Sequence, residues 1–133
     1  MDALGLRNAM RKKVLIVDDA LTVRTQLVGI LSGDFDCSTA ENGQEGFEKA
    51  LGLGPDAMVV DLEMPEVGGV ELLRLLHGNQ RTRTIPVIIA TTVTSLDRVN
   101  ECRALGCAGY VLKPVQGDYL LAKLRKLTSV KLV

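Results

Sequence analysis

Residues 57–65 read AMVVDLEMP and place four apolar side chains directly before an aspartate and a turn that contains a proline. A short apolar run bounded by a turn signal is typical of a strand that is buried on both faces. Asp61 ends the run, and an ionised carboxylate is costly to hold beside an apolar interior unless it has partners. The stretch therefore predicts a buried strand over 57–60 that delivers Asp61 to a polar site.

The same arrangement, an apolar run followed by a helical pattern, recurs outward from this strand toward both ends of the chain. Parallel strands need crossover connections, and helices with one apolar face supply them. The pattern predicts an α/β fold, in which a parallel sheet carries helices on both faces. The five predicted strands are Val14–Val17, Phe35–Ala40, Ala57–Val60, Pro86–Ala90 and Gly109–Leu112.

Two of the connecting helices begin at a recognisable capping sequence. Asn42 precedes Glu45 by three residues, which is the spacing of a capping box at the start of a helix. Thr94 and Asp97 have the same spacing, ahead of a helix that we expect to end near Gly106. These sequences predict where the second and fourth helices begin.

The composition fits one compact domain. The chain has 133 residues, of which 47% are hydrophobic and 24% are charged, so it can bury a core of its own. Its 16 basic residues balance 16 acidic ones, so no net field attracts it to nucleic acid or to an anionic membrane. No stretch approaches the roughly 18 apolar residues of a membrane span, and we expect a cytoplasmic protein. The domain is expected over residues 13–128, between a short extension at 1–12 and a tail at 129–133.

Polar residues follow four of the five predicted strands. The carboxyl ends of parallel strands meet at one edge of a sheet, where α/β proteins form their sites. The residues are Asp18 and Asp19 after the first strand, Asp61 after the third, Thr91 after the fourth and Lys113 after the fifth. Three aspartates gathered there would repel one another unless a cation such as Mg²⁺ or Mn²⁺ lay between them. With a lysine and a hydroxyl beside them, they predict a carboxylate nucleophile that accepts a phosphoryl group next to a metal ion.

These residues lie in four motifs whose order and spacing resemble those of the response regulator receiver domains of two-component signalling. The motifs are VLIVDD (residues 14–19), VVDLEMP (59–65), IPVIIAT (85–91) and GYVLKP (109–114). The resemblance covers residues 13–128. It implies the flavodoxin-like (βα)5 fold, a doubly wound parallel sheet with the strand order 2-1-3-4-5, of which CheY, a member of this family, is a known example.

The resemblance implies a role for each matching residue. Asp61 would be the phosphoacceptor, taking its phosphoryl group from the phosphohistidine of a sensor histidine kinase or phosphotransfer protein, or from acetyl phosphate. Asp18 and Asp19 would hold Mg²⁺, with Asp61 and the backbone carbonyl of Glu63 completing the protein ligands. Lys113 would pair with the phosphoryl group, and its bond to the following proline is expected to be cis. Such a chain is not a turnover enzyme, and it shows only weak autophosphorylation and autodephosphorylation.

The family also implies a switch and an output face. Thr91 and Tyr110 match a pair in which the threonine hydroxyl turns toward the phosphoryl group and the tyrosine ring moves inward. The output face would consist of the fourth helix, the fifth strand and the fifth helix, over Thr94–Leu105, Gly109–Leu112 and Asp118–Thr128. A downstream effector protein or output domain would bind this face, or a second copy would bind it as a phosphorylation-dependent homodimer. Direct binding to nucleic acid or to a membrane is not expected.

The chain departs from the family pattern at two positions. Thr92 stands where the family usually has a small residue such as alanine, and Gly68 stands where it often has aspartate. Gly68 and Gly69 together predict a loosened loop before the third helix.

Three other interpretations explain part of the pattern. A degenerate receiver would only bind partners, which does not account for the complete set of acceptor, acidic pair, threonine and lysine. A phosphatase of the haloacid dehalogenase type also uses an aspartate nucleophile and Mg²⁺, but its DxDxT motif differs from the sequence Asp61-Leu62-Glu63. A flavodoxin-like FMN carrier needs a loop rich in serine, threonine and glycine after the first strand, where this chain has DDALTV. The chain is either a stand-alone receiver or a part of a longer regulator.

Overall fold

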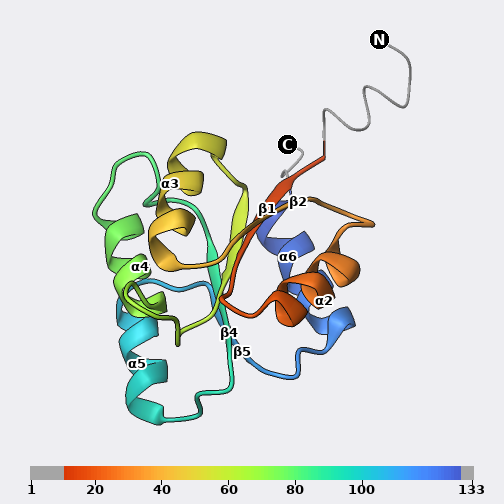
Figure 1. Ribbon diagram of the computed structural model, residues 1–133. Coiled ribbons are helices and arrows are strands. Elements are labelled where there is room, and N and C mark those ends of the chain that lie inside the picture. Colours follow the sequence, from red (N-terminus) through yellow and green to blue (C-terminus); the bar gives the residue numbers. More distant parts are fainter. Residues whose placement is uncertain (1–10, 130–133) are drawn as a thin grey trace.

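The computed structural model describes residues 11–129, and over this range the chain forms one parallel sheet with helices on both faces (Figure 1). The strand order is β2-β1-β3-β4-β5, which is the flavodoxin-like order that the resemblance implied. Strands and helices alternate along the chain, as predicted from the sequence pattern. The elements are β1 (Lys13–Val17), α2 (Leu21–Leu31), β2 (Asp36–Ala40), α3 (Gly43–Leu53), β3 (Ala57–Val60), α4 (Gly69–His77), β4 (Val87–Thr91), α5 (Leu96–Ala104), β5 (Gly109–Leu112) and α6 (Gly117–Thr128).

The strands are paired so that their carboxyl ends lie level with one another. Val17, the last residue of β1, is in register with Ala40 at the end of β2 and with Val60 at the end of β3. Every residue of β3 and β4 is buried, as expected for strands that are covered on both faces. The residues that follow these strands therefore emerge together at one edge of the sheet.

Each face of the sheet carries its own hydrophobic cluster. On one face, α3, α4 and α5 cover side chains that include Leu15 and Met58. On the other face, α2 and α6 cover side chains that include Ile16 and Val59. Successive side chains of a strand point to opposite faces, so neighbours in the sequence such as Leu15 and Ile16 belong to different clusters. This arrangement explains why the strands read as continuous apolar runs.

The observed bounds of several strands differ from the predicted ones by one residue. Phe35 precedes β2 because its N–H donates to the Leu31 carbonyl (2.9 Å) and continues the turn after α2. β4 runs one residue later than predicted, since Pro86 has no N–H for the ladder. Thr91 is included in β4, and its carbonyl accepts a hydrogen bond from the N–H of Lys113 (2.9 Å).

The start of α3 is confirmed, whereas the predicted start of α5 is wrong by one residue. The Asn42 side chain accepts a hydrogen bond from the N–H of Glu45 (2.8 Å), and the Glu45 carboxylate accepts one from the residue before Asn42 (3.2 Å). At α5, the cap is Ser95 and not Thr94, because Ser95 is the last residue with an extended backbone before the helix. Its hydroxyl accepts a hydrogen bond from the N–H three residues further on (3.1 Å).

The ends of the chain lie mostly outside the described residues. The expected extension at 1–12 and tail at 129–133 fall largely in residues 1–10 and 130–133, which the structure does not describe. β1 begins at Lys13 and α6 ends at Thr128. Within residues 11–129, no helix has the length and the apolar character that crossing a membrane requires.

Candidate functional site

The hydrogen-bond ladder of the sheet continues one residue past three strands and fixes the backbone of three predicted site residues. Each of the three donates its N–H to the carbonyl of the last residue of a neighbouring strand. The bonds run from Asp18 to Ala40 (3.1 Å), from Asp61 to Val17 (2.9 Å) and from Lys113 to Thr91 (2.9 Å). The pairing of the strands thus sets the relative positions of residues that are far apart in the sequence.

Asp18, Asp19 and Asp61 form a cluster with the donor chemistry of a metal site. One carboxylate oxygen from each residue lies within 4.8 Å of the other two. Mg²⁺ holds oxygen ligands at about 2.1 Å, so opposite ligands of one ion lie about 4.2 Å apart. Asp18 and Asp61 are buried and Asp19 is exposed, which leaves the cluster accessible from one side. The donor set therefore fits a hard divalent cation such as Mg²⁺ or Mn²⁺.

Lys113 lies between the two buried carboxylates. Its Nζ is 2.6 Å from Oδ2 of Asp18 and 3.5 Å from Oδ1 of Asp61. The bond between Lys113 and Pro114 is cis, as the resemblance implied. With all four groups ionised, the three aspartates and the lysine carry two net negative charges, which is the charge that a divalent cation balances.

The site raises the pKa of Asp61. Burial is the largest cause, because it penalises the charged form of the carboxyl group. The Lys113 ammonium and the Thr91 hydroxyl act to lower the pKa, the Asp18 carboxylate acts to raise it, and the net shift is upward. A cation among the three aspartates would favour the ionised form of Asp61 and oppose this shift.

Thr91 and Tyr110 both contact the backbone of Val93, in the loop between β4 and α5. The Thr91 hydroxyl accepts a hydrogen bond from the N–H of Val93 (3.3 Å), and the Tyr110 hydroxyl donates one to its carbonyl (2.6 Å). Thr91 is buried, and the half-buried Tyr110 ring packs against the hydrophobic cluster on the α4 and α5 side of the sheet. A single loop residue thus joins the two residues of the predicted switch.

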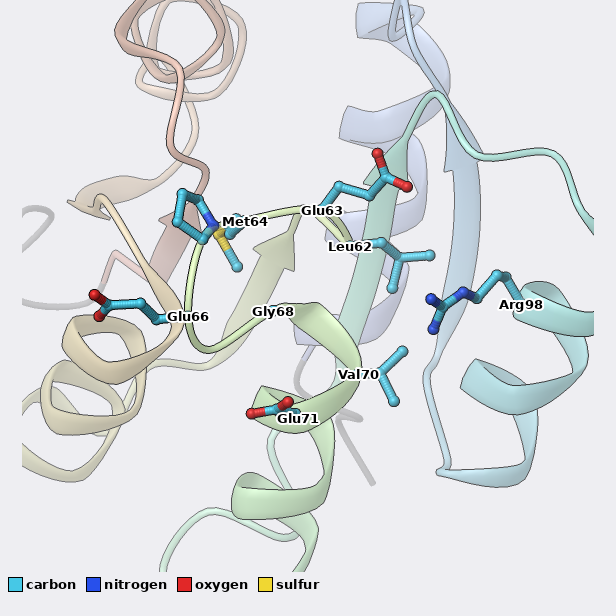
Figure 2. Close-up of a pocket in the computed structure, with 9 residues that line it drawn as sticks. Leu62, Glu63, Met64, Glu66, Gly68, Val70, Glu71 and Arg98 are labelled. Atoms are coloured by element: carbon cyan, nitrogen blue, oxygen red, sulfur yellow. The ribbon is translucent and has the colours of Figure 1, made fainter.

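Glu63 lies in the loop after β3, two residues past Asp61, with its side chain exposed. It helps to line a pocket of ≈ 480 Å³ between this loop, α4 and α5, whose lining side chains Figure 2 shows. In the same view Arg98 extends from α5 toward Leu62 and Val70. Among the described residues, the group of carboxylates that could hold a metal ion consists of the three aspartates and does not include the side chain of Glu63.

Gly68, the cap of α4, and Gly69, its first residue, pack closely against the backbone that follows β3. A Cβ atom at Gly69 would lie 2.4 Å from the carbonyl oxygen of Asp61, and one at Gly68 would lie 3.0 Å from that of Leu62. Larger residues would push the first turn of α4 away from the backbone of Asp61 and Leu62. The two glycines therefore allow a close approach at a place where the sequence predicted a loosened loop.

One residue that contacts the site was not found from the sequence. Arg24 in α2 donates from Nη1 to the backbone carbonyl of Asp18 (2.7 Å), and only 11% of its side chain is exposed. The sequence does place a basic residue in the first helical turn after the acidic pair, between the inward-facing Val23 and Leu27. The sequence does not show which way the side chain of Arg24 points.

The chain is similar to known proteins over most of its length, and residues 14–125 match the model of the response regulator receiver domain. The chemotaxis protein CheY of Pseudomonas aeruginosa is 31% identical over 117 residues, which cover 86% of this chain and 94% of that protein. A protein-glutamate methylesterase/protein-glutamine glutaminase of Anaeromyxobacter dehalogenans is 35% identical over 88% of this chain. That match covers 33% of the methylesterase, so the chain spans about a third of its length.

A solved structure agrees with the fold. The chemotaxis protein CheY4 of Vibrio cholerae matches with a TM-score of 0.82 and 29% identity, over 87% of this chain and 98% of that one. The family match, the strand order and the polar residues at the strand ends all lead to one conclusion. The chain belongs to the response regulator receiver domain family of two-component signalling.

Proposed function

We propose that this chain is the phosphoacceptor of a two-component system and that Asp61 receives the phosphoryl group. The observation that carries this proposal is the position of Asp61 at the end of β3, where it is buried within 3.5 Å of Lys113 and beside two further aspartates. A buried carboxylate is costly for the stability of a fold. A role as the nucleophile of a phosphoryl transfer explains why the fold contains a buried carboxylate despite this cost.

The metal ligands that we propose are Asp18, Asp19, Asp61 and the backbone carbonyl of Glu63, with Mg²⁺ or Mn²⁺ as the ion. When bound, the ion would offset the negative charge of the carboxylates and of the phosphoryl oxygens. The carboxylate of Asp18 is oriented by hydrogen bonds from the N–H of Ala20 (2.9 Å) and from Nζ of Lys113 (2.6 Å). A carboxylate held in this way needs little rearrangement on binding a cation.

The chemistry is a transfer of the phosphoryl group onto the protein itself. An oxygen of Asp61 attacks the phosphorus atom, the bond from phosphorus to the donor's imidazole nitrogen or acetyl oxygen breaks, and an aspartyl phosphate forms. Lys113 already lies beside Asp61 and would pair with a phosphoryl oxygen. Water later hydrolyses the aspartyl phosphate and restores the carboxylate. The chain thus has only weak autophosphorylation and autodephosphorylation activity and turns over no separate substrate.

The contacts of Val93 support a switch between Thr91 and Tyr110. A Thr91 hydroxyl that turns toward a phosphoryl group on Asp61 gives up the hydrogen bond that it accepts from Val93. Tyr110 donates its own hydrogen bond to the same residue. Phosphorylation would therefore move the loop between β4 and α5 together with the Tyr110 ring.

Exposed apolar side chains support the expected output face on α5, β5 and α6. Each element contributes one: Leu96 is 71% exposed, Leu112 is 51% exposed and Tyr119 is 55% exposed. A hollow of ≈ 580 Å³ lies between β5, the loop after it and the start of α6. We propose that a downstream effector protein or an output domain binds here, and that a sensor histidine kinase or phosphotransfer protein supplies the phosphoryl group.

Intact-mass spectrometry after incubation with acetyl phosphate and Mg²⁺ tests the proposed function. We expect the chain to gain the mass of one phosphoryl group, and we expect EDTA or the substitution Asp61→Asn to prevent the gain. Asp34→Asn is a matched control, because Asp34 lies between α2 and β2 and pairs with Arg125. A wild-type chain that gains no mass, even after a rapid quench, would contradict the proposal and favour a receiver that only binds partners.

A further inference from the structure

Asp18 is held by hydrogen bonds at its N–H, its carbonyl and both carboxylate oxygens. Its N–H donates to the Ala40 carbonyl (3.1 Å), and its carboxylate accepts from the N–H of Ala20 (2.9 Å) and from Lys113 Nζ (2.6 Å). Its carbonyl accepts from Nη1 of Arg24 (2.7 Å). Asp18 itself is 2% exposed. Of these partners, Arg24 is the one side chain to which the proposed phosphoryl transfer gives no role.

The hydrogen bond to the Asp18 carbonyl is the main contact of the Arg24 side chain. Arg24 lies in the first turn of α2, where its backbone N–H donates to the Ala20 carbonyl (3.0 Å). Its Nη2 lies 3.9 Å from the carboxylate of Glu41, whose side chain is 71% exposed. An ion pair of that length and exposure contributes little to the free energy of folding. The hydrogen bond to the carbonyl of Asp18 is therefore the contact that best explains the folded-back conformation of Arg24.

Arg24 connects the segments that frame the acidic pair. Its backbone belongs to α2, and its guanidinium reaches the end of β1 at Asp18 and the loop after β2 at Glu41. Only 11% of the Arg24 side chain is exposed, and burying its charge is costly unless the charge is hydrogen-bonded. Hydrogen bonds from a charged donor are stronger than those from a neutral one. This contact restrains the turn from Asp18 to Ala20, from which the carboxylates of Asp18 and Asp19 project.

We propose that Arg24 is a positioning residue of the metal site, which fixes the backbone of Asp18 and thereby the placement of both carboxylates of the acidic pair around the cation. This inference rests on the metal site proposed above. Removing a group that orients metal ligands through hydrogen bonds typically lowers metal affinity by roughly 10- to 100-fold. Because Arg24 acts through a backbone carbonyl, its loss belongs at the lower end of that range.

Positioning and simple electrostatics predict opposite effects of removing Arg24. A guanidinium near a cation site repels the cation, so the loss of its charge alone would tighten Mg²⁺ binding. The loss of a positioning contact weakens Mg²⁺ binding. Arg24→Met removes both the charge and the hydrogen bond, whereas Arg24→Lys keeps the charge and a shorter, single donor that replaces the guanidinium only in part.

Titration of the unphosphorylated chain with Mg²⁺, followed by amide NMR spectra, measures this effect without any assay of activity. We expect Arg24→Met to bind Mg²⁺ about tenfold more weakly than the wild type, and Arg24→Lys to be intermediate. Arg125→Met is the matched control, because Arg125 lies on α6 and pairs with Asp34 through a partly exposed contact. It should bind Mg²⁺ with wild-type affinity.

An Arg24→Met chain that binds Mg²⁺ as tightly as the wild type, or more tightly, would overturn the inference. The amide spectra show directly whether each variant is folded. Should Arg24→Met be unfolded, Arg24→Lys decides the question, since weaker binding supports the positioning role and unchanged binding refutes it. A wild-type chain that binds no Mg²⁺ would refute the proposed metal site itself, which is a distinct result.

Discussion

Asp61 is a buried carboxyl group whose pKa is raised, chiefly by burial, despite the attraction of Lys113. A raised pKa in the folded state stabilises the fold at a pH below the ordinary value of 3.8, and this contribution is lost as the pH rises through the folded-state pKa. In EDTA at neutral pH, Asp61→Asn should therefore raise the melting temperature, and the gain should vanish in acid below that value. Thermal denaturation over a pH series measures the difference. An Asp61→Asn chain that melts at or below the wild-type temperature at neutral pH would contradict the cost assigned to burial.

Mg²⁺ provides a control for the effect of Asp61. A cation that binds only the folded chain stabilises it, and tighter binding gives a larger stabilisation. Adding Mg²⁺ should raise the melting temperature of the wild type more than that of Asp61→Asn, because the variant lacks one charged ligand.

Glu66, in the loop between β3 and α4, has a positive φ of 65°. The left-handed region costs most L-residues roughly 1–2 kcal/mol, and asparagine tolerates it better. Glu66→Asn should therefore increase the free energy of unfolding by a few tenths to about 1 kcal/mol, as measured by urea denaturation. Glu71→Asn is the control and should give no gain in stability. Glu71 lies in the first turn of α4, where a carboxylate favours the helix. A loss of stability in Glu66→Asn would show that the strain is not relieved.

Single residues differ in how far the sequence predicts them. Asp61 and Lys113 could be found, because each directly follows an apolar strand. Arg24 and Glu66 could not, because the direction of a side chain and the sign of a φ angle depend on the path of the folded backbone. An arginine in the sequence does not indicate where its side chain will point, and a glutamate does not indicate a positive φ.

At the scale of helices, the two predicted capping sequences show what local pattern can and cannot resolve. The box at Asn42 contains one residue with the right side chain, and the structure confirms it. The sequence Thr94-Ser95 offers two adjacent hydroxyls, and only the backbone conformation decides between them. The sequence therefore predicts a helix cap uniquely only where no neighbouring residue could also serve as the cap.

The cap of α5 gives a prediction at this scale. Ser95→Ala should lower the free energy of unfolding by about 1 kcal/mol, because it leaves an N–H in the first turn of α5 without its partner. Thr94→Ala should change it by less than half as much, since Thr94 lies outside the cap. Urea denaturation of both variants decides between the two residues. A larger loss in Thr94→Ala would restore the start of α5 that the sequence predicted.

At the scale of the whole molecule, the alternation of strands and helices predicted the parallel sheet, and the resemblance supplied the strand order. The convergence of Asp18, Asp61 and Lys113 followed from the rule that parallel strands end at one edge. Their actual spacing could not be predicted, since it depends on the register between β1, β3, β4 and β5. The backbone hydrogen bonds of Asp18, Asp61 and Lys113 to neighbouring strands then fix the positions of these residues relative to one another.

The exposed apolar face of α5, β5 and α6 gives a prediction for the whole molecule. With acetyl phosphate and Mg²⁺, the chain should self-associate through this face, as measured by sedimentation velocity. Leu112→Glu should keep the phosphorylated chain monomeric, because it places a charge on the exposed part of β5. Leu53→Glu, at the end of α3 on a side chain that is 41% exposed, is the control and should self-associate like the wild type. A phosphorylated wild type that stays monomeric would leave this face to a different partner.

In the proposed function, Asp61 rather than a neighbouring carboxylate accepts the phosphoryl group. Borohydride reduces an aspartyl phosphate to homoserine and leaves free aspartate unchanged, so peptide mapping after reduction identifies the acceptor. In a chain treated with acetyl phosphate and Mg²⁺, we predict homoserine at position 61 and at no other aspartate. Homoserine in place of Asp18 or Asp19, or none in a chain whose mass shows the added phosphoryl group, would contradict the account.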